Sequence, residues 1–249
     1  MKQNQYDDAS FFKAYSQMPR SVQGLEGAGE WPVLRGMLPE LAGKRVLDLG
    51  CGFGWHSRYA AEQGAARVLG LDLSERMLER ARAECDDSRI EYRLGAIEDI
   101  GAIEDLDGGE AAFDVVLSSL ALHYVEDYGA VCARVQRCLA PGGRFVLSVE
   151  HPIFTARAAQ DWHYGPQGER LHWPVDEYQT QGSRETSFLG SHVVKYHRTV
   201  AAYMNLLLQA GFAVREVAEP APAAHLMDVP GMRDELRRPM FLIIAADRV

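Results

Sequence analysis

The chain has 249 residues, of which 47% are hydrophobic and 24% are charged, a balance that is typical of globular proteins and excludes a mostly disordered or collagen-like chain. Its formal net charge of -9 gives the average surface no attraction for a polyanion or an acidic lipid, so we expect neither a nucleic acid nor a membrane as partner. The four cysteines form no C-x-x-C pair and residues 1–10 lack the basic start and apolar stretch of a signal peptide, which together predict reduced thiols and a cytoplasmic location.

The amino-terminal region, residues 1–43, is predicted to form a helical cap. Prolines divide it into short helices, at Pro19, Pro32 and Pro39. Phe11, Phe12, Tyr15 and Met18 are spaced to share one helix face, and such a face ordinarily packs against the rest of the protein. The alternative interpretation is a lid that closes over a ligand.

From Arg45 onward, short apolar runs alternate with amphipathic stretches. This alternation predicts a doubly wound α/β fold, in which helices cover both faces of a parallel sheet. The expected strands are residues 45–49, 67–72, 90–94, 113–118, 144–149, 212–217 and 240–246. The expected helices are residues 55–63, 128–139 and 199–210, together with a helix that Ser74 caps. Residues 141–143 (PGG) are expected to stop the helix that precedes them.

Residues 152–195, here called the insert, do not follow this alternation. The insert is longer than an ordinary connection and rich in Trp, Tyr, His and Arg, and connections of this length are usually functional. Its aromatic residues are expected either to form a small core of their own or to wall a flat ligand: Trp162, Tyr164, Trp173 and Tyr178. The whole chain, 1–249, is predicted to be a single domain that carries the cap and the insert.

The densest basic cluster lies near the carboxyl terminus. Arg233, Arg237 and Arg238 are interleaved with Asp234 and Glu235, and runs of mixed sign usually form a solvated helix face. We therefore expect all three arginines to lie in solvent.

A glycine-rich turn follows the first expected strand. Gly50, Gly52 and Gly54 leave bare backbone that a ligand can approach. The dinucleotide fingerprint G-x-G-x-x-G would require glycine where this chain has Trp55, so a nicotinamide cofactor is disfavoured. Asp72 closes the second strand about twenty residues downstream, where a carboxylate can accept both hydroxyls of a ribose. These residues predict a site for an adenosine-containing ligand; the alternative is a tight turn and a solvated acid.

Residues 46–54 (VLDLGCGFG) resemble the first motif of the class I S-adenosylmethionine-dependent methyltransferases. Further matches follow in order: residues 70–74 (GLDLS) resemble the ribose-binding motif, 94–99 (LGAIED) the adenine-binding loop, 113–124 the fourth-strand motif and 139–143 (LAPGG) the turn before strand five. The match covers about residues 45–150 and is closer to the branch that acts on small molecules. It implies a Rossmann-like sheet of seven strands, the last one antiparallel, and S-adenosylmethionine as cofactor.

The resemblance also implies which residues bind the cofactor. They are Asp48, Gly50, Cys51, Gly52, Asp72, Leu73, Met77, Ala96, Ile97 and Ser119, with Tyr15 or Arg20 of the cap near the methionine carboxylate. Relatives often have an aspartate that accepts the adenine amino group at the position of Ala96. Adenine is therefore expected to rely on backbone groups of Ala96 and Ile97 and on apolar contact.

Transfer of a sulfonium methyl group is an in-line displacement, which needs aligned reacting atoms and the exclusion of water. An oxygen or ammonium acceptor usually needs a general base as well, most often a histidine. The expected candidates lie at the rim of the sheet, in the order of preference His151, His123 and His197. The alternative for each of the three is a structural role, in which the histidine forms hydrogen bonds within the protein. No metal site is predicted, because the histidines of the insert lack metal-binding spacing.

The predicted function is methylation of a small organic acceptor, at oxygen or nitrogen, by a monomer or homodimer. Two alternatives stay open. One is methylation of RNA, which the acidic balance disfavours, and the other is binding of S-adenosylmethionine without catalysis. The sequence does not identify the acceptor.

Overall fold

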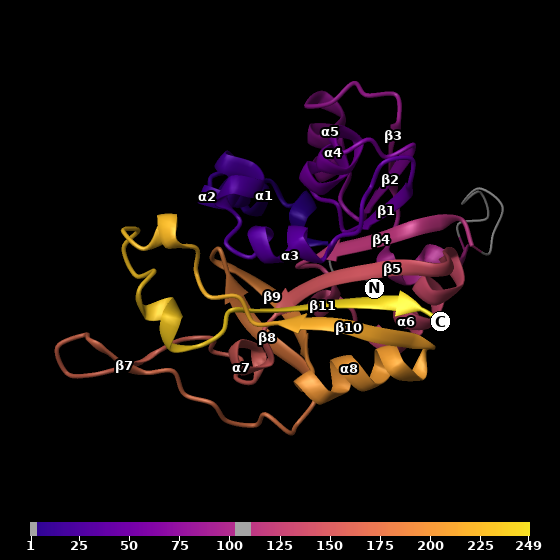
Figure 1. The fold of residues 1–249 in the computed structure, drawn as a ribbon. Coiled ribbons are helices and arrows are strands. Elements are labelled where there is room, and N and C mark those ends of the chain that lie inside the picture. Colours follow the sequence, from indigo (N-terminus) through magenta and orange to yellow (C-terminus); the bar gives the residue numbers. More distant parts are fainter. Residues whose placement is uncertain (1–3, 103–110) are drawn as a thin grey trace.

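A central sheet of seven strands organises the chain, as Figure 1 shows. The computed structural model describes residues 4–102 and 111–249, so the first three residues of the expected cap lie outside the described part. In spatial order the strands are β10 (Phe212–Ala218), β11 (Phe241–Arg248), β5 (Leu139–Glu150), β4 (Phe113–Ser119), β1 (Arg45–Leu49), β2 (Arg67–Asp72) and β3 (Ile90–Leu94). Within these two stretches, no helix is long and apolar enough to cross a membrane.

One strand of the sheet is reversed. β1 pairs in parallel with β2 and β4, β2 with β3, and β4 with β5, whereas β11 lies antiparallel between β5 and β10. This arrangement confirms the predicted doubly wound, mostly parallel sheet. The strand order reverses between β1 and β4, and ligands of open α/β sheets bind outside the carboxyl ends of the strands at such a point.

Helices cover both faces of the sheet: α3 (Trp31–Met37), α4 (Trp55–Glu62), α5 (Glu75–Ala83), α6 (Tyr128–Cys138) and α8 (Val200–Gln209). Alternate residues of a strand point to opposite faces, so a strand that is buried on both sides serves two cores. In β1, Leu47 and Leu49 pack in the cluster under α6 and α8, whereas Val46 packs under α4. In β4, Val115 lies under α4 and Leu117 under α3, which places these two helices on one face.

The fifth strand begins earlier than predicted. β5 starts at Leu139, so residues 141–143, which were expected to separate the preceding helix from the strand, lie inside it. Phe113 pairs with Leu139, but Val115 pairs with Arg144. The proline and the two glycines therefore occupy an irregularity in the ladder, where such residues are tolerated. The expected strand, 144–149, is its regular part.

The region before β1 forms the expected short helices. They are η1 (Gln5–Asp7), α1 (Ala9–Ser16), α2 (Pro19–Gln23) and η2 (Gly24–Gly27), followed by α3. Pro19 opens α2 and Pro32 lies in the first turn of α3. In the first turn of a helix, a missing N–H removes no intrahelical bond, so these prolines start helices.

The insert contains strands that the sequence did not predict. α7 (Pro152–Thr155) is followed by the short pair β6 (His163–Tyr164) and β7 (Arg170–His172), and then by a hairpin of β8 (Gly182–Phe188) and β9 (Ser191–His197). The two turn residues, Leu189 and Gly190, have φ of 53° and 77°, the left-handed values that two-residue hairpin turns use. Leucine rarely adopts this conformation, so the turn lacks the Asn-Gly or Asp-Gly pair by which such hairpins are usually recognised in a sequence. Figure 1 shows the hairpin at the same end of the sheet as α1 and α2.

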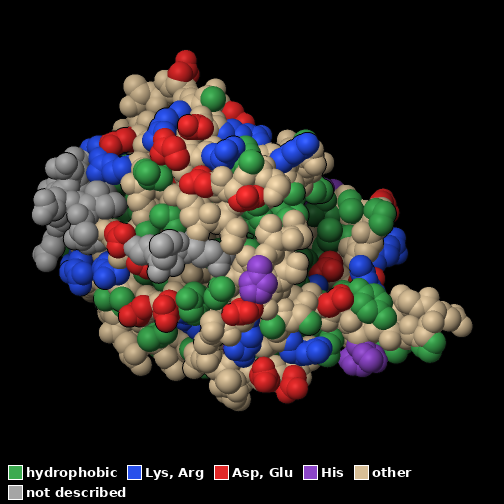
Figure 2. All heavy atoms as spheres, turned by 180° about the vertical axis from the view of Figure 1, so that it is seen from behind, with side chains coloured by type: hydrophobic (Ala, Val, Ile, Leu, Met, Phe, Trp, Pro, Cys, Tyr) green, Lys and Arg blue, Asp and Glu red, His purple; other side chains and the backbone are tan. Residues whose placement is uncertain are grey.

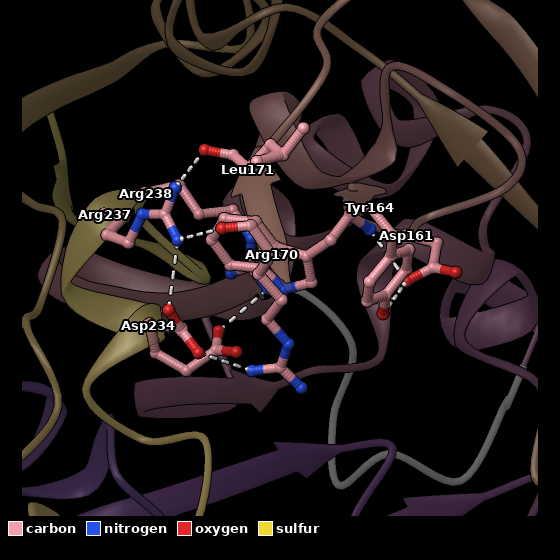
Figure 3. Close-up of polar contacts among 9 residues, drawn as sticks. Asp161, Tyr164, Arg170, Leu171, Asp234, Arg237 and Arg238 are labelled. Atoms are coloured by element: carbon pink, nitrogen blue, oxygen red, sulfur yellow. Dashed lines mark hydrogen bonds and ion pairs between the residues drawn. The ribbon is translucent and has the colours of Figure 1, made fainter. Parts of the chain in front are cut away.

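The carboxy-terminal loop, residues 219–240, is fastened to the insert by arginines (Figure 3). Arg237 donates to the backbone oxygens of Arg170 and Leu171, at 3.0 and 2.5 Å, and Arg170 forms an ion pair with Asp234 at 3.0 Å. These contacts join two segments that lie more than sixty residues apart in the sequence. The division of the chain into domains stays a prediction.

The expectation that all three arginines of this loop lie in solvent was wrong for Arg238. Arg233 and Arg237 are exposed, but Arg238 is 8% exposed and its guanidinium lies 4.0 Å from the centre of the Trp173 ring. The ring of Phe154 stacks on Trp173 and also contacts Arg238, at 4.8 Å. A planar guanidinium can stack on aromatic faces, and an ion pair with Glu235 at 2.8 Å balances its charge.

Replacing Arg238 by Lys should loosen the insert without unfolding the sheet, because lysine keeps the charge but cannot stack as a plane. Hydrogen exchange of residues 153–173 should become faster, which corresponds to a loss of about 1 kcal/mol of local protection. Amides of β4 and β5 should exchange as before. The matched control is Arg233→Lys, because the Arg233 side chain is 80% exposed. Equal exchange in the two variants would show that the stacking has no stabilising effect.

Candidate active site

A cavity of about 420 Å³ lies at the carboxyl ends of the central strands, within the range of about 300–1,000 Å³ that is typical of small-molecule sites. One wall comes from the loops that follow β1, β2, β3 and β4. The other comes from the cap, from the insert and from the start of β11. The expected residues that line it are Tyr15, Arg20, Gly50, Gly52, Asp72, Leu73, Met77, Ala96, Ile97, Ser119 and His123.

The glycine turn after β1 forms the floor of this cavity. Gly50 and Gly54 have positive φ, and a Cβ at these positions would lie 2.4 Å from the Cβ of Ala121 and 2.1 Å from the hydroxyl of Tyr92. Both glycines are therefore required by the protein's own packing. Gly52 differs: its φ is +54°, it lines the cavity, and a Cβ there would meet no atom within 4 Å. Its missing side chain leaves room for a ligand to approach the backbone.

Asp72 joins the ends of two strands. One carboxylate oxygen accepts the backbone N–H of Gly52 at 2.8 Å, and the other accepts that of Ser74 at 2.9 Å. Burial raises the pKa of Asp72, although these hydrogen bonds oppose the shift. A carboxylate has about four acceptor positions. The contacts from Gly52 and Ser74, with a further one from the backbone of Leu73, do not use all of these positions, so the carboxylate can still accept from a ribose hydroxyl.

Asp48 and Cys51 were expected at the cofactor site, and the structure places both beneath it. Neither lines the cavity, and their exposed fractions are 1% and 5%. Asp48 accepts the hydroxyl hydrogen of Ser57 at 2.7 Å, which fixes the start of α4 against β1. Burial raises the pKa of Asp48 to about 7, the Ser57 bond opposes this shift, and Asp72 adds to it. Their position indicates a supporting role for these two side chains.

The cap covers the cavity with aromatic rings. Tyr15 packs edge-on against Phe53 of the glycine turn at 5.7 Å, and Phe11 packs against Phe188 of β8 at 5.9 Å. Tyr6, which the sequence did not single out, contacts both Tyr15 and Phe11, at 5.2 and 5.0 Å. The predicted apolar face therefore packs over the cavity and meets the glycine turn and the insert.

Two further contacts hold the cap against the elements that line the cavity. The Asp7 carboxylate accepts the Ser74 hydroxyl at 2.6 Å and the Arg76 backbone N–H at 3.2 Å. Arg20 lines the cavity and donates to Glu30 at 2.8 Å. A guanidinium has five N–H donors, so the bond to Glu30 leaves others for a ligand.

The structure separates the three candidate histidines. His123 lines the cavity, whereas His151 and His197 do not. Nδ1 of His151 accepts the Ile153 backbone N–H at 3.0 Å, and its Nε2 lies 2.7 Å from a carboxylate oxygen of Glu219. These contacts occupy both ring nitrogens, so the geometry does not support the expected preference for His151 as a base.

His197 is likewise held on both sides. Its Nε2 donates to the backbone oxygen of Tyr178 at 2.9 Å, which requires that Nδ1, at 2.9 Å from the Thr155 hydroxyl, is the acceptor when the ring is neutral. Burial lowers the pKa of His197, which favours this neutral form. The ring thus links β9 to α7 and does not face the cavity.

A polar group that was not predicted from the sequence faces the cavity from β5 and the insert. Glu150 ends β5, Lys195 lies in β9, and the two side chains form an ion pair at 2.7 Å. Gln160 bonds to both, and all three residues line the cavity. The buried residues of β9 alternate, at Val193, Lys195 and His197, but two of these three are polar, so no hydrophobic alternation in the sequence marks Lys195 as inward-facing.

The aromatic residues that face the cavity are also different from those expected. Phe154 of α7 and Phe188 of β8 line it, whereas Trp162, Tyr164, Trp173 and Tyr178 do not. Trp162 and Trp173 pack against each other at 5.3 Å and surround Arg238. Of the two interpretations given for the aromatic residues of the insert, these two tryptophans fit a small separate core.

Solved structures resemble this chain over almost its whole length. One from Listeria monocytogenes, described as a candidate S-adenosylmethionine-dependent methyltransferase, is 52% identical and covers 91% of this chain and 99% of its own, with a TM-score of 0.84. An S-adenosylmethionine-dependent methyltransferase from Mesorhizobium loti is 48% identical and covers 90% of this chain and 100% of its own, with a TM-score of 0.81. A family model described as a methyltransferase domain matches residues 47–147.

The chain belongs to the S-adenosylmethionine-dependent methyltransferases. It is an enzyme of this family, with the Rossmann-like sheet expected of class I members and S-adenosylmethionine as cofactor.

Two named relatives of this methyltransferase match it over a shorter stretch. The 27-O-demethylrifamycin SV methyltransferase of Amycolatopsis mediterranei is 38% identical over 46% of this chain and 41% of its own. The ubiquinone biosynthesis O-methyltransferase of Idiomarina loihiensis is 40% identical over 43% of this chain and 43% of its own. Each of these two matches thus covers less than half of this methyltransferase and less than half of the relative.

The raised pKa of Asp48 predicts a specific dependence of the methyltransferase's stability on pH. The carboxyl of Asp48 has a pKa of about 7 in the folded chain and near 3.8 in the unfolded chain, so its protonated form favours folding. This stabilisation is complete below about pH 4 and is lost as the pH rises to about 7. Asp48→Asn removes the titration and keeps an oxygen for Ser57.

The free energy of unfolding is measured in urea at pH 5 to 8 without cofactor. As the pH rises, the value for Asp48→Asn should increase relative to the value for the wild type. The change should be at most about 1.4 kcal/mol per pH unit and should level off above about pH 8. Asp114→Asn is the control, because hydrogen bonds from Arg45 lower the pKa of Asp114. A constant difference between wild type and Asp48→Asn would contradict the prediction.

Proposed function

We propose that this methyltransferase binds S-adenosylmethionine against the loops that follow β1, β2 and β3, and methylates a small organic acceptor, at oxygen or nitrogen, beneath the insert. The observation that carries the proposal is the pairing of Asp72 with Gly52. An acid with unused acceptor capacity lies beside bare backbone on the wall of one cavity.

The described residues fit an adenosyl group. Asp72 would accept the two ribose hydroxyls, and the open space above Gly52 would admit the ligand close to the backbone. Leu73, Met77 and Ile97 line the same part of the cavity and would contact the adenine ring through apolar surface. Ala96 offers no side-chain acceptor, so adenine selectivity would depend on the backbone there.

The cap would hold the methionine part. Arg20 and Tyr15 both line the cavity, and the unused N–H donors of Arg20 match a carboxylate. Burial raises the pKa of Tyr15, so its hydroxyl stays protonated at neutral pH. The aromatic rings of the cap would keep water from the reacting atoms.

The cofactor supplies a methyl group that is already activated by the positive sulfur. The protein's contribution is therefore positional: it holds the acceptor atom in line with the methyl carbon and excludes water. The wall formed by the insert and β11 is well suited to this task because it is largely apolar, with Phe154, Phe188, Val193, Met240 and Phe241 among its residues.

A small acceptor agrees with the surface and with the relatives. Acidic and basic side chains are interspersed on the face shown in Figure 2, and the net charge of -9 gives a polyanion no general attraction. The two named relatives are, by name, methyltransferases of 27-O-demethylrifamycin SV and of ubiquinone biosynthesis. Both names support a small-molecule acceptor here.

Replacing Asp72 by Asn should weaken binding of S-adenosylmethionine by about 10- to 100-fold, because the charged acceptor for the ribose hydroxyls is lost. Isothermal calorimetry on the purified protein measures this directly, and S-adenosylhomocysteine serves as a second ligand. The control Asp114→Asn also removes one negative charge, but Asp114 lies at the start of β4, beside Arg45 and away from the cavity. Unchanged affinity in Asp72→Asn would remove Asp72 from the cofactor site, and undetectable binding to the wild type would refute the proposal.

A second variant tests the approach to the backbone. Gly52→Ala places a methyl group in the open space, so cofactor affinity should fall by about tenfold or more. Gly43→Ala is the matched control, because Gly43 also has positive φ, +72°, and open space around its Cβ, but lies outside the cavity. Both variants should lose similar stability from the strained backbone, and only Gly52→Ala should lose affinity. Equal affinity in the two would contradict the assigned position of the cofactor.

A further inference from the structure

A buried ion pair lies in the part of the cavity beneath the insert, where the acceptor is proposed to bind. The side chain of Lys195 is 2% exposed and that of Glu150 is 18% exposed, and their Nζ and Oε1 atoms are 2.7 Å apart. Gln160 completes the group: its Oε1 accepts from Lys195 at 2.9 Å and its Nε2 donates to Glu150 at 3.2 Å. Three segments meet here, namely the end of β5, the chain after α7, and β9.

This group is costly as a purely structural feature. Removing two charges from water is unfavourable, and apolar residues of similar size are often as stabilising as a buried pair. Aromatic rings surround the lysine, with Phe188 at 5.3 Å and Phe154 at 6.0 Å from its nitrogen. A charged pair that lines a cavity in such surroundings is a candidate for contact with the substrate.

The pair has hydrogen-bonding capacity left. A lysine ammonium has three N–H donors, and two of them serve Glu150 and Gln160. The Glu150 carboxylate has about four acceptor positions, of which Lys195 and Gln160 occupy two. One donor and one or more acceptors are therefore available to a ligand in the cavity.

His123 adds a second donor beside them. Its Nδ1 faces the backbone N–H of Glu150 at 3.4 Å, so in the neutral ring the proton lies on Nε2. Burial lowers the pKa of His123 to about 4, with Lys195, Arg198 and Arg20 acting in the same direction and Glu150 opposing them. His123 is thus neutral at physiological pH, and its Nε2 proton is available to another polar group of a ligand.

We propose that the acceptor is an uncharged hydroxyl group on a flat apolar ring, a phenol in chemical class, whose oxygen accepts one hydrogen bond from Lys195 while Glu150 accepts its proton, which leaves the second lone pair of the oxygen for the methyl carbon. This inference rests on the function proposed above and narrows it to O-methylation.

Charge explains the selection of a neutral group. An ammonium acceptor would approach the positive Lys195, and a carboxylate would approach the negative Glu150, so each would face one like charge in a site of low polarity. A hydroxyl both accepts and donates, and it therefore satisfies both members of the pair. The rings of Phe154 and Phe188 suit a flat partner, since aromatic pairs favour stacked or edge-on contact.

The reaction step is balanced without any other reagent. An oxygen lone pair forms the bond to the methyl carbon as the carbon–sulfur bond breaks, and the electrons of that bond stay on sulfur. The positive charge that develops on the oxygen makes its O–H group strongly acidic, so the O–H bond breaks in the same step and the proton passes to the Glu150 carboxylate. Burial raises the pKa of Glu150, but the charges and hydrogen bonds around it outweigh burial and lower it, so this carboxylate takes the proton only as the new bond forms. The products are a methyl ether and S-adenosylhomocysteine, and Glu150 returns its proton to water when the products leave.

Binding of three matched probes tests this inference. 2-Naphthol, 2-naphthoate and (2-naphthyl)methylammonium share one ring system and differ in the group that would face Glu150 and Lys195. The protein is first saturated with S-adenosylhomocysteine, whose binding is itself recorded, and each probe is then titrated by calorimetry. 2-Naphthol should bind at least about tenfold more tightly than either charged probe.

A double variant shows whether the pair is the cause. Lys195→Met with Glu150→Gln removes both charges together, so no single buried charge is left unpaired, and it should abolish the preference for 2-naphthol while S-adenosylhomocysteine binds as before. The control Arg89→Met with Asp87→Asn removes an exposed ion pair and should keep the preference.

The outcomes separate the two proposals. If S-adenosylhomocysteine does not bind, the proposed function fails and this inference with it. If it binds but a charged probe equals 2-naphthol, if no probe binds, or if the double variant keeps the preference, the inference alone is overturned.

Discussion

The hydrogen bond between the Gly52 backbone and the Asp72 carboxylate is the contact on which the site depends. It connects the turn after β1 to the end of the neighbouring strand, β2. The turn can approach that acid only because three glycines adopt positive φ, and two of them avoid collisions with Ala121 and Tyr92. The bond fixes the distance between bare backbone and carboxylate before any ligand arrives, so little ordering is left for binding to accomplish.

The same region anchors the cap. Ser74, whose N–H also bonds to Asp72, donates its hydroxyl to Asp7. The turn after β2 thus holds both the floor of the cavity and the segment that covers it. This shared anchor explains how two parts of the chain that are distant in sequence form one enclosed site.

The sheet and the placing of the glycine turn beside Asp72 were predictable because their signals are local. Strand β1, the glycine turn and Asp72 lie within thirty residues, and each residue type has a physical reason to stand where it does. The histidines were harder, because their roles depend on contacts across the chain: His151 meets Glu219, and Nδ1 of His123 meets the backbone of Glu150. A histidine at the end of a strand looks the same in the sequence whether or not its nitrogens are already bonded.

The side of the cavity beneath the insert shows the same limit more strongly. Lys195 and Glu150 are 45 residues apart, and a hairpin with leucine in its turn brings them together. That hairpin also carries Phe188, whose ring touches Phe11 of α1. The cap and the hairpin of the insert, which both cover the cavity, therefore contact each other at these two rings. Separation of these two rings would open both covers of the cavity at once, so the proposed cofactor and the methylated product would leave by one route.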